Sequence, residues 1–223
     1  MRQGGKGKKM KGIDTKARLD EYLEELERIN RLEKIDFCGR YLGASSTHNV
    51  ADPMELYELY NNGFHVVGIH GDTSHGEEYF AKDRYRHDLL EISEIRKRYR
   101  IPVNGCVYIP VDYDAGPENW GGIREYFKNI EMGVRLNDEL RKAYQLGGFG
   151  VMGSGYVCSQ VKREHPNIRT WVIHKDDWRP PMTRKFKPDI ERVDCVRETS
   201  FPANWDIASK DCGAWKLNVA KFV

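Results

Sequence analysis

The segment VNGCVYIPVDYDA, residues 103–115, is the most strand-like stretch of this 223-residue chain. Similar apolar runs occur before it, in FCGRYLG (37–43) and FHVVGIH (64–70), and after it, in GFGVMGSG (148–155) and TWVIH (170–174). Amphipathic stretches with helical spacing separate most of about eight such runs, and this alternation is typical of parallel βαβ units. The sequence therefore predicts an α/β fold, a single-domain (β/α)8 barrel that is short for its class and partly irregular in its last third.

Helix signals support this interpretation. Asp52 followed by Pro53 is typical of a helix start, and residues 79–100 and 123–146 each predict one long helix. Residues 176–202 contain four prolines and predict a long irregular excursion. Two final strands are expected over 205–209 and 215–220. A doubly wound open sheet is the main alternative, and it is disfavoured because no Gly-rich phosphate-binding motif follows the first strand.

The charge of the chain is unevenly distributed. The formal net charge is +2, from 36 Lys and Arg against 34 Asp and Glu. Residues 1–12 hold five bases and no acid, which leaves a mildly acidic remainder. We therefore expect a basic tail over 1–10 and a barrel domain over 11–223. Nucleic-acid binding by the domain is disfavoured, whereas the bases within 1–11 suggest an anionic partner or an assembly contact.

The composition also limits the cellular context. No apolar run approaches the roughly 20 residues that a membrane span needs. The charged start lacks an apolar segment after it, which predicts no secretory signal and a cytoplasmic location as synthesised. Five scattered cysteines (Cys38, Cys106, Cys158, Cys195 and Cys212) predict buried reduced thiols instead of a disulfide framework or a zinc site. No cofactor is expected.

Two carboxylates end the strongest predicted strand. Residues i and i+2 of a strand project to the same face, so Asp112 and Asp114 should lie side by side, roughly 6.5–7 Å apart. In a barrel, this end of the strand is where catalytic residues gather. Paired carboxylates hold one proton between them and serve glycoside hydrolysis. The spacing alone also fits a divalent-ion ligand or a solvated loop.

Several blocks together resemble a glycoside-hydrolase-like domain family of bacteria and phages, related to glycoside hydrolase family 25, the Chalaropsis-type lysozymes. The similarity runs in order over about 11–221, and its specific parts are V-D-Y-D-A at 111–115 and G-S-G-Y-V-C at 153–158. The remaining blocks are GID at 12–14, FCGRYLG, the pair Trp205-Asp206, and LNVA at 217–220. The resemblance implies a (β/α)8-type barrel that acts on peptidoglycan or a related amino-sugar polymer.

The resemblance also assigns roles to individual positions. Asp14 matches the acidic residue that ends the first strand, and Asp112 and Asp114 match the acidic pair of the fourth. Asp114 would act as the general acid, Asp112 would orient the substrate N-acetyl group, and Asp14 would separate the pKa values of the pair. The relatives carry D-x-E where this chain has D-x-D, so the acid has about one methylene less reach.

Further positions complete the expected substrate groove. The resemblance places Arg40, Tyr41, Trp205 and Asp206 at strand ends, and Tyr113 lies between the two carboxylates. Trp178 and Trp205 are the expected sugar-stacking platforms, although buried packing is the usual role of tryptophan. His70 directly ends the third strand and is expected inside the pocket. The His- and acid-rich segment 70–78 lacks a compact metal-ligand spacing, so no metal is expected there.

Two function hypotheses remain open. The first is a cell-wall lytic, muramidase-like glycoside hydrolase; a phage lysin would reach its substrate by release from the cell. The second is a catalytically inactive barrel that binds glycan or forms part of a larger assembly such as a phage particle. Departures from the family pattern at Met152, Ala208 and Lys216 favour the second hypothesis, and a metal-dependent hydrolase is a third with less support.

Overall fold

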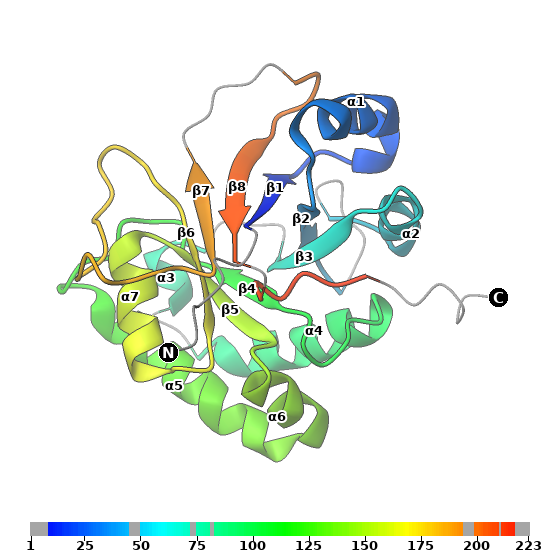
Figure 1. Ribbon diagram of the computed structural model, residues 1–223. Helices are drawn as coiled ribbons and strands as arrows, with labels where there is room; N and C mark the ends of the chain where they lie inside the picture. The colour runs from blue at the N-terminus through cyan, green and yellow to red at the C-terminus, as the bar shows by residue number, and fades with distance from the viewer. Residues whose placement is uncertain are drawn as a thin grey trace, which may run out of the picture.

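The computed structural model describes residues 9–44, 50–71, 75–80, 83–193, 199–209 and 211–216. Eight strands form a closed barrel in which neighbours follow the order of the chain (Figure 1). The α/β barrel that the strand and helix alternation predicted is thereby confirmed. The strands are β1 Met10–Thr15, β2 Phe37–Leu42, β3 His65–His70, β4 Val107–Pro110, β5 Phe149–Gly153, β6 Arg169–Val172, β7 Ile190–Val193 and β8 Asn204–Ala208.

Helices connect the first six strands. Figure 1 shows α1 and α2 on one side of the barrel and α4 to α7 on another. The described residues after α7 form no further helix, so the chain enters β7 and β8 through loops. The helices are η1 Leu19–Tyr22, α1 Leu23–Glu33, α2 Pro53–Asn61, α3 Glu77–Phe80, α4 Tyr85–Arg98, α5 Trp120–Gly133, η2 Val134–Leu136, α6 Asp138–Gln145 and α7 Gly155–Glu164.

The barrel closes through an antiparallel strand. β8 runs antiparallel to β7 and to β1, whereas the other neighbours are parallel. This arrangement places the first residue of β8, Asn204, beside Asp14 near the end of β1. The amino-terminal end of β8 therefore contributes to the same barrel mouth as the carboxyl ends of β1 to β7.

Local signals predicted the helix starts more accurately than the helix lengths. Asp52 caps α2 by accepting backbone N–H bonds, at 2.8 and 2.9 Å, as its sequence predicts. The single helix expected over 123–146 is instead α5, η2 and α6, because the Asn137 side chain accepts two backbone N–H bonds and starts a new helix. The helix expected over 79–100 likewise begins only at Tyr85 as α4.

The end of the chain differs more from expectation. Residues 176–202 were expected to be irregular, yet they contain β7, which pairs with both β6 and β8. The strand expected over 215–220 is described only to residue 216, where Trp215 forms an isolated bridge with Val66. Residues 1–8, and so most of the basic tail, lie outside the described part, as does Cys195.

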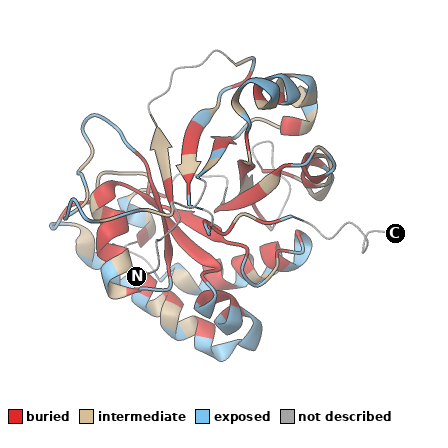
Figure 2. Cartoon of the chain, viewed as in Figure 1, coloured by how far each residue is buried: buried red, intermediate tan, exposed pale blue. Residues whose placement is uncertain are grey.

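Two apolar cores lie on opposite faces of the strands. The larger one fills the space between the barrel wall and the helices, and the smaller one lies inside the barrel. Figure 2 shows most strands buried and the helices exposed on their outer faces, whereas β7 is only partly buried. The inner core includes Phe37, Val67, Tyr108, Met152 and Trp171. Successive strand residues therefore alternate between the barrel interior and the helix layer.

Gly39 shows how tightly the interior is packed. A Cβ atom at this position would lie 2.7 Å from the indole of Trp171 and 2.9 Å from the Cβ of Asp14. Only a glycine on β2 lets Trp171 cross the barrel directly beneath Asp14. The indole ring of Trp171 therefore forms the bottom of the barrel mouth, and its N–H can donate to a polar neighbour.

Two expectations from composition can be checked on the described residues. Cys38, Cys106, Cys158 and Cys212 are buried free thiols, and burial raises the pKa of each. No described helix has the length and apolar character that crossing a bilayer requires.

A candidate active site in the barrel mouth

The inward side chains of β1, β7 and β8 form a charged cluster at the mouth. The guanidinium Nη2 of Arg192 on β7 donates to both carboxylate oxygens of Asp14, at 2.9 and 2.8 Å. The side-chain amide of Asn204 donates to Asp14 as well, at 3.1 Å. The side chain of Asp14 is only 2% exposed. A buried carboxylate that accepts these three hydrogen bonds, two of them from a cation, is held in one orientation.

Asp206 lies beside this cluster, one layer deeper. It is paired in the sheet with Gly12 on one side and with Arg192 on the other. Its Oδ1 accepts a hydrogen bond from Trp171 Nε1 at 2.8 Å, whereas no described N–H donor reaches its Oδ2, and the carboxyl group of Asp14 is its nearest polar contact on that side. Burial first, and then the charge of Asp14, raises the pKa of Asp206 well above its ordinary value. Asp14 and Asp206 therefore form a carboxylate pair in which Asp206 retains its proton more strongly than an ordinary aspartate does.

Tyr41 connects this pair to the rim of the barrel. Burial raises the pKa of the Tyr41 phenol, and the charges of Asp14 and Asp112 raise it further. The phenol therefore lies close to both carboxylates. The Nζ of Lys16 lies 5.0 Å from the ring centroid of Tyr41, within the range of a cation–π contact. Of the residues proposed from the sequence, the structure thus brings Asp14, Tyr41 and Asp112 to one part of the mouth.

Asp112 is half-buried and fixed by the segment before α3. Its Oδ2 accepts the backbone N–H of His75 at 2.9 Å, and its own N–H donates to the carbonyl of His75 at 3.1 Å. These two bonds fix the carboxylate to a neighbouring loop and leave part of its surface accessible.

Asp114 points in another direction. Because β4 ends at Pro110, Asp112 and Asp114 lie in a loop, so the side-by-side strand geometry expected for them is wrong. The backbone N–H of Arg179 donates to Asp114 Oδ1 at 2.8 Å, and Arg179 Nη1 donates to Oδ2 at 3.1 Å. The guanidinium also contacts Glu118 at 3.0 Å. Asp114 is therefore occupied as an acceptor by a loop that follows β6.

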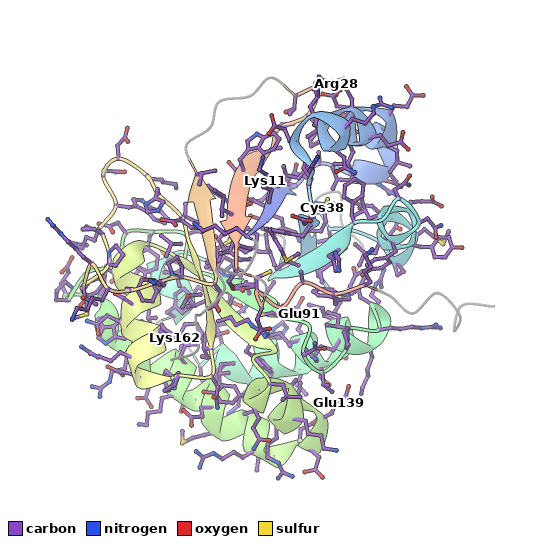
Figure 3. The ribbon with its side chains drawn as sticks, viewed as in Figure 1. Lys11, Arg28, Cys38, Glu91, Glu139 and Lys162 are labelled. Carbon is purple, nitrogen blue, oxygen red and sulfur yellow. The ribbon has the colours of Figure 1, made fainter. Side chains whose placement is uncertain are left out.

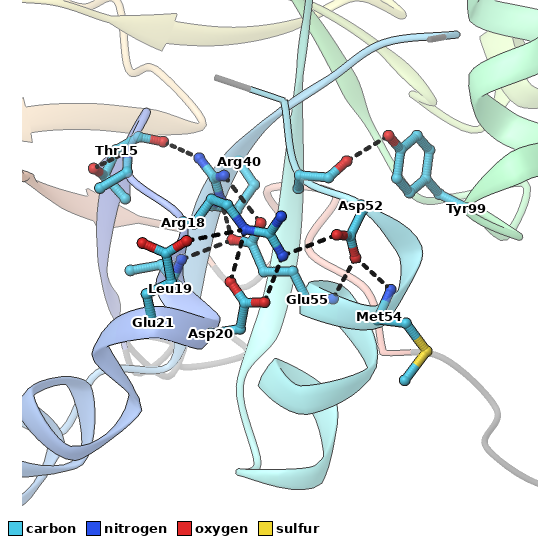
Figure 4. A network of polar contacts seen from close by, with 12 residues as sticks. Thr15, Arg18, Leu19, Asp20, Glu21, Arg40, Asp52, Met54, Glu55 and Tyr99 are labelled. Carbon is cyan, nitrogen blue, oxygen red and sulfur yellow. Dashed lines mark hydrogen bonds and ion pairs between the residues drawn. The ribbon is translucent and has the colours of Figure 1, made fainter. Parts of the chain in front are cut away.

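Arg40 does not line the mouth, which corrects the expectation. It follows the inward-facing Gly39, so its side chain points into the helix layer and is completely buried. There it forms a salt bridge with Glu55 on α2, at 2.6 Å from Nε to Oε1, and it also donates to the carbonyl of Thr15 (Figure 4). Arg40 is a structural residue that joins β1 and β2 to α2.

His70 and Trp205 are placed on the helix side by the same alternation. His70 follows the inward-facing Ile69, and its Nε2 lies 3.2 Å from Glu91 on α4, so the expectation that it lies inside the pocket is wrong. Trp205 precedes Asp206 and packs in the outer core, where its ring is unavailable as a sugar platform. Tyr113 also packs against that core, near Phe80.

Trp178, in the loop that follows β6, is partly exposed. It packs at the edge of the inner core, and the Nζ of Lys175 lies 4.2 Å from its ring centroid. A partly exposed indole with an adjacent cation keeps the role of a stacking surface open for Trp178.

Sequence reasoning missed three residues that shape this site: Arg192, Asn204 and Arg179. Arg192 and Arg179 both lie in the segment expected to be irregular, where no strand was predicted. The period-2 pattern of Ile190-Glu191-Arg192-Val193 was the available signal, and it is short. Asn204 lies beside Asp14 because β8 pairs antiparallel with β1. No local sequence pattern indicates this pairing.

Comparisons with known proteins address the fold. No family model matches the chain. The uncharacterised protein FadG of Bacillus subtilis is 26% identical over 144 residues, which is 62% of this chain and 24% of FadG, so the match spans a minor part of that relative.

Solved structures match over most of the chain at low identity. A Tat-secreted protein of Mycobacterium tuberculosis has a TM-score of 0.64 at 13% identity, covering 92% of this chain and 98% of that one. The modular autolysin LytC of Streptococcus pneumoniae has a TM-score of 0.52 at 13% identity, covering 89% and 46%. A glycosyl hydrolase 25 virulence factor of the same species has 0.50 at 13% identity, covering 90% and 87%. The fold is therefore shared with glycoside hydrolase 25-like proteins.

The comparison also corrects the expected location. The chain was expected to be cytoplasmic as synthesised, but the matched mycobacterial protein of the same fold is Tat-secreted. The expectation of a cytoplasmic location is wrong on this finding.

Proposed function

We propose that this chain is a lysozyme-like barrel that hydrolyses peptidoglycan or a related polymer of N-acetyl amino sugars. The observation that carries the proposal is the carboxylate pair Asp14 and Asp206, in which the pKa of Asp206 is raised, beneath Tyr41 and Asp112 at the barrel mouth. Glycoside hydrolysis needs acidic groups of different protonation state around one sugar. The pneumococcal autolysin of the same fold has been seen in complex with a synthetic peptidoglycan ligand, which supports this substrate class.

In this mechanism Asp112 orients the substrate N-acetyl group and stabilises positive charge on the sugar ring. Asp114 donates a proton to the leaving oxygen, and for this the guanidinium of Arg179 has to move away. Arg179 is 40% exposed, and exposed ion pairs of this kind contribute about 0–1 kcal/mol. Binding of a sugar at the rim is sufficient to displace it. Export from the cytoplasm, as for the secreted protein of this fold, would bring the domain to the wall.

A second candidate function is glycan binding without turnover. The contact between Arg179 and Asp114 favours it, because an acid that accepts two donors is not positioned to give a proton. The shorter reach of Asp114, compared with the Glu of the lysozyme relatives, favours it too.

The test is digestion of purified peptidoglycan, with soluble muropeptides and co-sedimented protein measured in the same samples. We expect the parent to release muropeptides, and Asp112→Asn and Asp114→Asn to release almost none while still co-sedimenting. Asp138→Asn is the control, because Asp138 is an exposed residue of α6 far from the mouth carboxylates in the chain.

If the parent releases muropeptides and neither Asp112→Asn nor Asp114→Asn reduces this release, the roles assigned to Asp112 and Asp114 are contradicted. Co-sedimentation of the parent without release would replace the hydrolase proposal with the binding function. Arg179→Ala separates the two further, because it removes the guanidinium from Asp114 Oδ2 while the backbone N–H at position 179 still donates to Oδ1, and it should raise release only if hydrolysis occurs.

A further inference from the structure

Two lysines at the barrel mouth each lie over an aromatic ring. Lys16 follows β1, and its Nζ is 5.0 Å from the ring centroid of Tyr41 on β2. Lys175 lies in the loop after β6, and its Nζ is 4.2 Å from the ring centroid of Trp178. Both distances are within the cation–π range of about 6 Å. Both lysines are exposed and both rings pack against the inner core, so each pair is a cation held on a fixed aromatic surface.

The two pairs lie on opposite sides of the mouth. Three strands separate β2 from β6 in either direction around the closed barrel (Figure 1). Tyr41 is the penultimate residue of β2, and the loop with Trp178 leaves the carboxyl end of β6, so both pairs are at the mouth end. On one of the two paths β4 is the middle strand. Asp112, just after β4, therefore falls midway along the rim between the two pairs.

The charge of both lysines is available to a ligand. Arg192 and Arg179 at the mouth are already paired with carboxylates of the protein. Lys16 and Lys175, by contrast, form no ion pair with any residue that the structure describes. The acids at 176–177 are exposed, and solvent and salt screen their charge.

The distribution of charge defines which ligand fits this mouth. Asp112 is fixed by a backbone N–H and has no cation beside it among the described residues, so it repels a carboxylate at the centre of the rim. Lys16 and Lys175 attract carboxylates at the two flanks. The ring beside each lysine offers a flat apolar surface on which a sugar can stack. The best ligand is therefore a sugar strand with an uncharged group at the centre and carboxylates on both sides of it.

We propose that Lys16 with Tyr41, and Lys175 with Trp178, form two subsites for a strand of amino sugars that carries carboxylates. Each lysine binds a carboxylate, and each ring stacks on the sugar that bears it. The inference rests on the proposed function for the kind of polymer, and it adds a preference for negative charge at two positions. It holds whether or not the strand is cleaved.

The experiment compares two soluble ligands that differ only in charge. Peptidoglycan glycan strands without their stem peptides carry a lactyl carboxylate on alternate sugars, and coupling with methylamine converts these groups to neutral amides. Calorimetric titrations use the full chain with Asp112→Asn, which keeps the strands intact if the proposed hydrolysis occurs. This background also removes the central charge, so that any remaining preference comes from the flanks.

Native strands should bind about 10–25-fold more tightly than amidated strands, because each exposed pair of a cation and a carboxylate contributes up to about 5-fold. Lys16→Gln and Lys175→Gln should each weaken the binding of native strands about 3–5-fold and leave that of amidated strands nearly unchanged. Added salt should reduce the preference. Lys11→Gln is the matched control, because Lys11 (labelled in Figure 3) is an exposed lysine near the amino-terminal end of β1, away from the mouth.

The proposal is overturned if both strands bind equally, if neither binds, or if the double variant Lys16→Gln/Lys175→Gln binds native strands as tightly as Lys11→Gln does. All three lysines are exposed, so these substitutions leave the packing intact. Failure of the proposed hydrolysis has a different result. A protein that prefers native strands but releases no product retains the subsites and loses the hydrolase function, whereas cleavage without any preference for native strands has the opposite meaning.

Discussion

Replacing Asp206 with asparagine should stabilise the protein at neutral pH. In the parent, Asp206 Oδ2 is buried, no described N–H donor reaches it, and it lies beside the carboxylate of Asp14. The introduced amide keeps an oxygen to accept the indole N–H of Trp171 and adds an NH₂ group that can donate to Asp14. The variant therefore replaces a group whose ionised form is disfavoured by a permanently neutral one, without opening a cavity.

The magnitude follows from the missing donor. A buried polar atom that lacks its hydrogen-bond donor costs about 1–3 kcal/mol. For a chain of this length, 1 kcal/mol changes the Tm by about 2–4 °C, so we expect an increase of roughly 2–12 °C at pH 8.

The pH dependence follows from the direction of the pKa shift. The pKa of Asp206 is raised in the folded state, mainly by burial and then by Asp14. Its protonated form therefore favours folding below the unfolded pKa of about 3.9, and this contribution is lost as the pH rises through the folded pKa. The stability difference between Asp206→Asn and the parent should be small near pH 4 and grow toward pH 8.

The assay is thermal and urea unfolding of both proteins from pH 4 to pH 8. Asp206→Ala is the comparison, because it leaves Trp171 Nε1 without an acceptor and opens a cavity, and it should destabilise at every pH. If Asp206→Asn is less stable than the parent at pH 8, or if the difference does not change with pH, the description of the carboxylate pair is incorrect.

Three further perturbations test other parts of the structure. Glu55→Gln leaves the buried guanidinium of Arg40 without its counter-charge and should cost about 3–5 kcal/mol in urea unfolding, whereas simultaneous replacement of both by apolar residues should cost much less. Gly39→Ala forces a methyl group against Trp171 and should cost about 1–3 kcal/mol, with a changed near-ultraviolet dichroism signal. Asp52→Ala should cost about 1 kcal/mol at pH 7. Burial alone would raise the pKa of Asp52, but its cap hydrogen bonds and Arg18 lower it overall, so the cost of Asp52→Ala should disappear as the pH falls below about 3.9 through the lowered folded pKa.

The sequence was informative where local chemistry decides the outcome. Helix α2 begins where Asp52 and Pro53 predicted, and Ser154 caps α7 by accepting the N–H of Val157 at 3.2 Å. Apolar runs predicted most strands of the barrel. These features depend on residues within a few positions of one another, and a single sequence contains that information.

The direction of individual side chains was harder to predict. Adjacent strand residues point to opposite faces, so Arg40 and Tyr41 cannot both face the mouth. Strand patterns that are apolar on both faces give no sign of which residue of such a pair points inward. The contacts of Arg192 and Asn204 with Asp14 join strands from opposite ends of the chain and depend on the closure of the barrel.

The central claim is that this barrel hydrolyses a glycosidic bond with its mouth carboxylates. The most direct test is digestion of peptidoglycan in ¹⁸O-labelled water, followed by mass spectrometry of the new reducing-end sugars. The account predicts one ¹⁸O atom at each new reducing end with the parent and almost no labelled product with Asp112→Asn. If the folded parent leaves the glycan uncleaved and unlabelled, hydrolysis by this barrel is contradicted.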